Sequence, residues 1–205
     1  MITDKTCLDV GCGHGDFTIK CGSFAKGIVG FDCTDAFIQT GNANRRSNVT
    51  FVVGNAKDGL PFASDEFDCA YNRKGPTSAY PELQRVVKKG GNILGLHPGD
   101  DLGKELPTIF PHLFPRCSGT PIADKLTDQL VKSRFTYYRI QTYHAIEYLK
   151  TPHDVVLYRC FGQTPELIYE VMETSLPEIT RIFNEHATVD GLPITFSRYI
   201  VRAIV

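Results

Sequence analysis

A short segment near the start of the chain has glycine at every second position: Asp9-Val10-Gly11-Cys12-Gly13-His14-Gly15. It follows an apolar run and precedes a stretch with helical periodicity, which predicts a strand, a tight loop and a helix. Glycine permits positive φ and has no Cβ, so a large ligand can lie directly on the backbone of such a loop. The first amides of the following helix favour a negatively charged group on that ligand.

The first half of the chain alternates β-rich runs with helical stretches, which favours an α/β fold with a parallel sheet covered on both faces. The predicted strands are 6–10, 27–31, 49–53, 67–71 and 93–96, and the predicted helices are 17–24, 36–43 and one from Pro81 to Gly90-Gly91. The second half adds a helix at 123–133, a strand at 135–148, helices beginning at Thr164 and again at the capping box Ser175-Leu176-Pro177-Glu178, and a strand at 194–200.

The length of 205 residues predicts one domain, in which residues 1–97 form the ligand-binding core and residues 122–205 the C-terminal half of the sheet. Between them, residues 98–121 combine recurrent proline with apolar side chains. A long loop of this composition favours a lid or an acceptor-binding segment, and the alternative is a loop packed on the core.

The composition restricts the partners and the location of the protein. A formal net charge of -1 leaves no global basic footprint, which disfavours a long nucleic-acid interface. None of the seven cysteines lies in a C-x-x-C pair, and no signal peptide or bilayer-spanning run is present. We therefore expect reduced thiols in a cytoplasmic protein, and no metal site, because the histidines lack paired spacing.

The glycine spacing indicates the class of ligand. A dinucleotide-binding loop reads G-x-G-x-x-G, whereas the third glycine here comes one place earlier. This form resembles motif I of the class I methyltransferases that use S-adenosylmethionine (SAM). Three later segments resemble the same family in the same order: Val29-Gly30-Phe31-Asp32, the stretch from Gly54-Asn55-Ala56 to Asp65-Glu66-Phe67-Asp68, and the helix end Glu82 to Gly91.

The resemblance implies a doubly wound, mostly parallel, seven-stranded Rossmann-like sheet with an antiparallel last strand, and SAM as cofactor. Asp32 would accept hydrogen bonds from ribose hydroxyls. Asn55 stands where the family has an acid that binds the adenine amine; its amide oxygen can still accept that bond but brings no charge. The implied cofactor-binding residues are Asp9, Gly11, Cys12, Gly13, His14, Asp32, Cys33, Asn55, Ala56, Asn72 and Arg73.

The residues after the fourth and fifth predicted strands are expected to meet the methyl acceptor. Arg73 and His97 are the candidate catalytic residues: Arg73 would steer an anionic acceptor and His97 would act as general base. The alternative for His97 is a strand-end histidine hydrogen-bonded to backbone. The sequence favours a small, partly apolar or planar acceptor.

Other functions stay open. His97-Pro98-Gly99-Asp100, with Lys104-Glu105-Leu106 and Lys150-Thr151-Pro152-His153, resembles the rRNA guanine-N1 methyltransferases, whose zinc ribbon is missing here. An rRNA or tRNA base methyltransferase is therefore the first alternative. A non-catalytic SAM-binding protein and a nicotinamide oxidoreductase are the others.

Motif I begins close to the first residue, whereas such proteins normally carry one or two helices ahead of it. We expect an open cofactor site, or one covered by residues 98–121 or by a second subunit in a homodimer.

Overall fold

The computed structural model describes residues 1–115 and 119–205, so residues 116–118 of the predicted lid lie outside the described residues. The chain forms two compact units. The first comprises Met1–Pro98, Thr120–Thr142 and Tyr199–Val205, and the second comprises Gly99–Gly119 and Tyr143–Arg198. The expected single domain over residues 1–205 stays a prediction.

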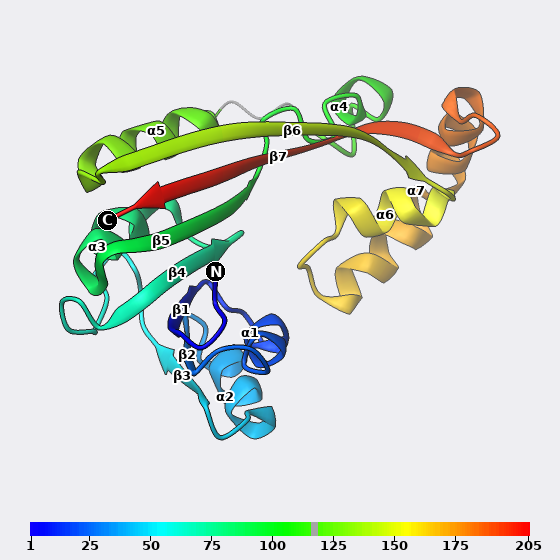
Figure 1. Ribbon diagram of the computed structural model, residues 1–205. Helices are drawn as coiled ribbons and strands as arrows, with labels where there is room; N and C mark the ends of the chain where they lie inside the picture. Colours follow the sequence, from blue (N-terminus) through cyan, green and yellow to red (C-terminus); the bar gives the residue numbers. More distant parts are fainter. Residues whose placement is uncertain (116–118) are drawn as a thin grey trace. The chain divides into compact units, whose positions relative to one another are not determined.

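Seven strands in the described part of the chain form one sheet in the order β3-β2-β1-β4-β5-β7-β6 (Figure 1). They are Thr6–Val10 (β1), Gly27–Asp32 (β2), Val49–Val53 (β3), Phe67–Arg73 (β4), Val87–Pro98 (β5), Tyr137–Leu149 (β6) and Leu192–Ile204 (β7). Strands β1 to β5 pair in parallel. Strand β7 runs antiparallel to β5, since Gly90 near the start of β5 donates to the Val205 carbonyl and Gly99, just past its end, donates to that of Ser197. The predicted doubly wound sheet with an antiparallel last strand is confirmed.

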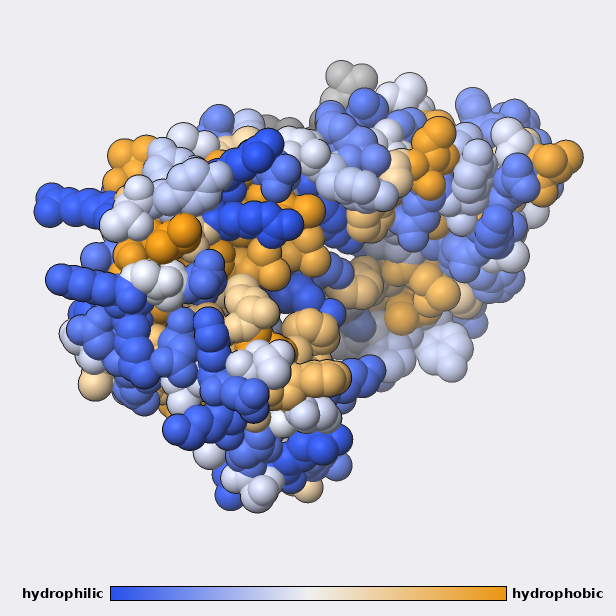
Figure 2. All heavy atoms as spheres, in the orientation of Figure 1, coloured by the Kyte–Doolittle hydropathy of each residue, from blue (hydrophilic) through white to orange (hydrophobic). Residues whose placement is uncertain are grey.

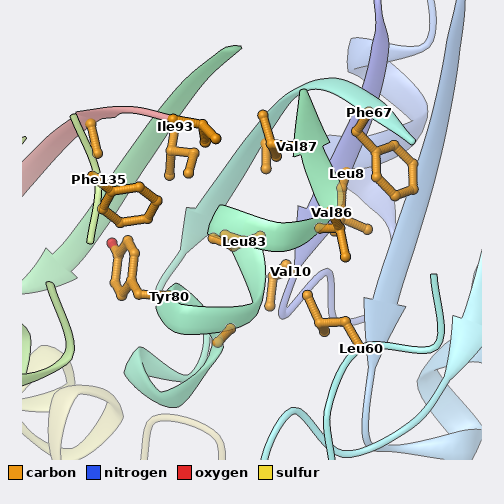
Figure 3. Packing of buried hydrophobic residues seen from close by; sticks show 14 of the residues in the cluster. Leu8, Val10, Leu60, Phe67, Tyr80, Leu83, Val86, Val87, Ile93 and Phe135 are labelled. Atoms are coloured by element: carbon orange, nitrogen blue, oxygen red, sulfur yellow. The ribbon is translucent and has the colours of Figure 1, made fainter. Parts of the chain in front are cut away.

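Helices cover both faces of the sheet in the first unit. They are α1 (Asp16–Cys21), α2 (Asp35–Asn44), α3 (Tyr80–Val86) and α5 (Ile122–Ser133), with a short 3-10 helix at Thr77–Ala79. On one face, Leu83 and Val86 of α3 pack with Leu8 and Val10 of β1 (Figure 3). Because successive strand residues point to opposite faces, Cys7 of β1 instead joins the cluster that includes side chains from α1 and α2.

The second unit has its own apolar core, built on α4 (Leu106–Ile109), α6 (Pro152–Arg159) and α7 (Pro165–His186). Leu106 and Phe110, which belong to the predicted lid, are almost fully buried in this core. The apolar side chains of that segment are thus satisfied by packing inside the second unit, and its role as a lid stays a prediction. In the part of the chain that the structure describes, no helix is long and apolar enough to cross a membrane.

Three expected helix boundaries are wrong. The helix expected over 17–24 ends at Cys21. The helix that contains Pro81 ends at Val86, not at Gly90-Gly91, and β5 begins at once. Val87 is fully buried and pairs with Phe67, after which the register of the β4–β5 pair shifts. Burial of Val87 therefore ends the helix, and Gly90, with φ +74°, lies where the register of the β4–β5 pair shifts.

Ser175 does not start a new helix, because α7 runs unbroken through Pro177. Proline removes one hydrogen bond from a helix interior. The apolar face of α7 packs into the core of the second unit on both sides of this position, for example through Met172 and Ile179. The packing outweighs the local helix-breaking signal.

Helix α6 was not predicted, although the sequence contains a recognisable capping motif at its start. The Thr151 hydroxyl accepts a hydrogen bond from the Asp154 amide at 3.3 Å, and the Asp154 carboxylate accepts from the Thr151 amide at 2.8 Å. This capping box, followed by Pro152 in the first turn, fixes the helix entry.

We expect Gly95→Ala to destabilise the fold by about 1 to 3 kcal/mol, the usual cost of overpacking a core. A Cβ at Gly95 would lie 1.9 Å from the Tyr80 hydroxyl oxygen. In a Tyr80→Phe background the same change should cost at least about 0.5 kcal/mol less, as measured by urea unfolding of a double-mutant cycle. Gly27→Ala is the matched strand control, since its nearest atom is 3.9 Å away. Equal costs in both backgrounds would contradict the clash.

Candidate active site

The three glycines of the first loop lie in different surroundings, although all have positive φ. A Cβ at Gly11 would lie 2.5 Å from the Gly75 Cα, and one at Gly15 would lie 2.4 Å from the Phe51 ring. A Cβ at Gly13 would have no protein atom within 4 Å. Gly11 and Gly15 are therefore needed for packing, whereas Gly13 has open space beside its backbone.

Asp32, at the end of β2, lies against this loop. The Gly13 amide donates to its Oδ2 at 3.0 Å, and the Thr34 amide donates to its Oδ1 at 3.0 Å. A carboxylate offers about four lone-pair sites, so each oxygen keeps capacity for one more donor. The structure thus brings together the two residues that the sequence assigned to one ligand, and leaves the acid able to bind hydroxyl groups.

Asp9 is only 2% exposed, which distinguishes it from the open part of the loop. The Thr18 hydroxyl of α1 donates to its Oδ2 at 2.5 Å. Burial raises the pKa of Asp9 to about 6, against the lowering effect of the Thr18 hydrogen bond. In this geometry Asp9 ties the end of β1 to α1.

Asn72 lies beside the start of the glycine loop, since β1 and β4 pair Val10 with Asn72. Its Nδ2 donates to the Pro76 carbonyl at 2.9 Å. Its Oδ1 is buried and has no hydrogen-bond partner among the described residues. A buried acceptor of this kind is costly unless a ligand or water supplies a donor.

Of the other residues assigned to the cofactor, Asn55 and Ala56 lie in the loop after β3, and His14 lies in the glycine loop. Asn55 is exposed, and its Oδ1 accepts a hydrogen bond from the Lys57 amide at 3.0 Å, while Ala56 is buried. The His14 ring lies against Phe37, with 3.9 Å between ring centroids. The His14 ring is thus packed on Phe37, and contact of its backbone with the cofactor stays a prediction.

Both cysteines of the predicted cofactor site are free thiols. Burial raises the pKa of Cys12 to about 12, so it is protonated at neutral pH. Cys33 is exposed at the end of β2. Among the described residues no group of three or more histidine, cysteine or acidic side chains could hold a metal ion.

The two candidate catalytic residues point to opposite faces of the sheet. Leu96 pairs with Arg73, and both line a cavity of about 280 Å³ that also contacts Asn72. His97 follows Leu96 in β5, so its side chain leaves the other face. There its Nε2 lies 2.8 Å from the Tyr80 hydroxyl of α3.

His97 is 2% exposed, and burial lowers its pKa to about 4. It is therefore neutral at physiological pH. Its Nε2 partner is the tyrosine hydroxyl, and the alternative of a backbone hydrogen bond stays a prediction. Its general-base role stays a prediction.

Sequence reasoning missed two residues that shape the site. Gly75 meets the glycine loop, and Phe17 of α1 lies under the Arg73 guanidinium, 4.2 Å from Cζ to the ring centroid. Gly75-Pro76 is a readable turn signal after β4. Nothing in the sequence pattern pairs Phe17 with Arg73.

We expect Asp9→Asn and His97→Gln to change the pH dependence of stability in opposite directions. The folded pKa of Asp9 lies above its usual 3.8, so the wild type loses stability as pH rises from 3.8 to about 6. The folded pKa of His97 lies below its usual 6.5, so the wild type loses stability as pH falls from 6.5 to about 4.

As pH rises from 4 to 6, the free energy of unfolding of Asp9→Asn should increase by about 3 kcal/mol relative to wild type. As pH falls from 6.5 to 4, that of His97→Gln should increase by about as much. Urea unfolding at half-unit pH steps measures both slopes. Parallel curves for wild type and variant would show that the group does not titrate as inferred.

Comparison with known proteins identifies the family of the chain. The sequence model of the methyltransferase-domain family matches residues 3–181. A ubiquinone/menaquinone biosynthesis C-methyltransferase from Pectobacterium carotovorum is 28% identical over 135 residues, which cover 57% of this chain and 53% of that protein. A tRNA U34 carboxymethyltransferase from Actinobacillus succinogenes is 30% identical over 103 residues, or 45% of this chain and 32% of that protein.

The chain thus spans about half the length of the first of these curated relatives. A solved SAM-dependent methyltransferase from Methanosarcina mazei matches with a TM-score of 0.57 and 19% sequence identity. The match covers 100% of this chain and 94% of the solved chain, which shows a shared fold. The family match over most of the chain confirms the resemblance inferred from motif I and the segments after it. The chain belongs to the methyltransferase-domain family.

Proposed function

We propose that the chain binds SAM on its first loop and transfers the methyl group to a small-molecule acceptor. One observation carries the proposal: Gly13 presents unobstructed backbone, and its amide is bonded to the Asp32 carboxylate. Membership of the methyltransferase-domain family makes SAM the ligand of choice for that arrangement.

The residues present fit SAM group by group. The free lone pairs of Asp32 suit the ribose hydroxyls, and the unpartnered Oδ1 of Asn72 suits the amino group. Asn55 lies on the exposed loop after β3, where its amide oxygen would accept from the adenine amine. Asp9 is enclosed against Thr18, so we assign it to holding the loop rather than to touching the ligand.

When bound, SAM supplies a methyl group made electrophilic by its sulfonium. The chain's own contribution is then to align the acceptor with that group and to exclude water. A general base is needed only for an acceptor that keeps its proton at neutral pH. With its lowered pKa and its contact with Tyr80, His97 would be a weak base.

The acceptor class rests on two observations. One relative is named for ubiquinone and menaquinone biosynthesis, and the net charge of -1 gives no electrostatic support for RNA. The alternative, an RNA base, is favoured by the relative named for tRNA U34. A cytoplasmic location, a homodimer and the lid role of residues 98–121 stay predictions.

Thermal unfolding with candidate ligands tests the proposal. SAM or S-adenosylhomocysteine at a hundred times its dissociation constant should add about 2.7 kcal/mol to stability, and NADH should add nothing. Stabilisation by NADH alone would indicate an oxidoreductase. Tight SAM binding without methyl transfer to small molecules or RNA would indicate a SAM-binding protein.

We expect Gly13→Ala to lower the affinity for S-adenosylhomocysteine at least tenfold, because its Cβ would occupy the open side of the loop. At the same ligand concentration the stabilisation would then fall from about 2.7 to about 1.4 kcal/mol. Gly90→Ala is the matched control: φ there is +74°, and a Cβ again meets no atom within 4 Å. Both variants carry the same kind of backbone strain, so equal ligand affinity in the two would place the ligand elsewhere.

A further inference from the structure

The cavity beside Arg73 is lined mostly by apolar side chains of α1, β4 and β5, such as Phe17 and Leu96, and by Met1 and Ile2 at the start of the chain. Its volume is about 280 Å³. Figure 2 shows hydrophobic side chains gathered on the face of the first unit where Figure 1 draws β4 and β5. The cavity is thus large enough for a small organic molecule with an apolar body.

The cavity adjoins the proposed cofactor loop. Asn72, which lines it, pairs with Val10, the residue before Gly11. Phe17 and Cys21, which also line it, belong to the helix that follows the loop. A molecule in the cavity would therefore lie next to whatever the glycine loop holds.

Arg73 supplies the one side chain of fixed charge among the residues that line this cavity. Its guanidinium stacks on the Phe17 ring, at 4.2 Å from the centroid, which holds the planar group in place. None of the ion pairs among the described residues includes Arg73. The positive charge of Arg73 lowers the pKa of Asp9, but that carboxylate is buried against Thr18.

An arginine held in this way presents hydrogen-bond donors in a rigid fork that matches a carboxylate. The apolar walls reject a fully hydrated ion and favour a molecule that has an apolar or planar body at one end. We propose that this cavity is the acceptor subsite, and that it selects small aromatic or aliphatic carboxylates through Arg73. This inference rests on the proposed function and names its substrate class.

Matched pairs of probes test the charge preference: benzoate with benzamide, cinnamate with cinnamamide, and 1-naphthoate with 1-naphthamide. Each pair shares its shape and differs in the charge that Arg73 would recognise. Affinities are measured by calorimetry, with and without saturating S-adenosylhomocysteine. In at least one pair the carboxylate should bind about tenfold tighter than the amide, the effect of hydrogen bonds to a charged group.

Variants locate that preference. Arg73→Met should bring the ratio in that pair below about twofold, while Arg73→Lys, which keeps the charge, should retain part of it. Arg45→Met removes an exposed arginine whose guanidinium donates to Asn42 Oδ1 and which does not line the cavity, and should leave the ratio unchanged. Melting temperature without ligand confirms that each variant is folded.

Ratios near one in all three pairs, or a preference that survives Arg73→Met, would overturn the inference. Failure of S-adenosylhomocysteine to bind would instead overturn the proposed function, because the carboxylate preference is measured without it as well. The two failures are therefore distinguishable.

Discussion

The close approach of two glycine-containing loops is the constraint on which the site depends. A Cβ on Gly11 would lie 2.5 Å from the Gly75 Cα, and one on Gly75 would lie 2.4 Å from the Val10 carbonyl oxygen. Any side chain at either position would push apart the loops that follow β1 and β4. These strands are neighbours at the point where the strand order reverses, which is where open α/β sheets bind ligands.

Two buried titratable side chains fix helices to opposite faces of the sheet near this point. Asp9 is bonded to Thr18 of α1, and His97 to Tyr80 of α3. Burial disfavours the charged form of each, so it raises the pKa of the acid and lowers that of the histidine. Between pH 4 and 6 the cost of Asp9 rises with pH while the cost of His97 falls, so the two slopes oppose each other. The pair therefore makes the free energy of unfolding nearly independent of pH there, although both groups lower it.

The accuracy of the sequence-based elements follows the strength of their local signals. Strands β1 and β3 have the predicted bounds, since most of their residues are apolar or β-branched and turn residues flank them. The boundary at Gly90-Gly91 was wrong because burial of Val87 extended β5 backward. The restart at Ser175 was wrong because contacts of α7 with the core of the second unit hold the helix through Pro177.

The sequence by itself determined the α/β class, the glycine loop and its acidic partner, because glycine spacing and hydrophobic periodicity are local properties that no distant contact alters. Only the tertiary structure decided what each of these residues does. In it Asp9 is buried, His97 lies on the face of the sheet opposite the cavity, and the Arg73 guanidinium lies over the Phe17 ring. Those outcomes depend on which strands are neighbours and on the face from which each side chain projects. Strand pairing sets both, and the local sequence pattern does not specify them.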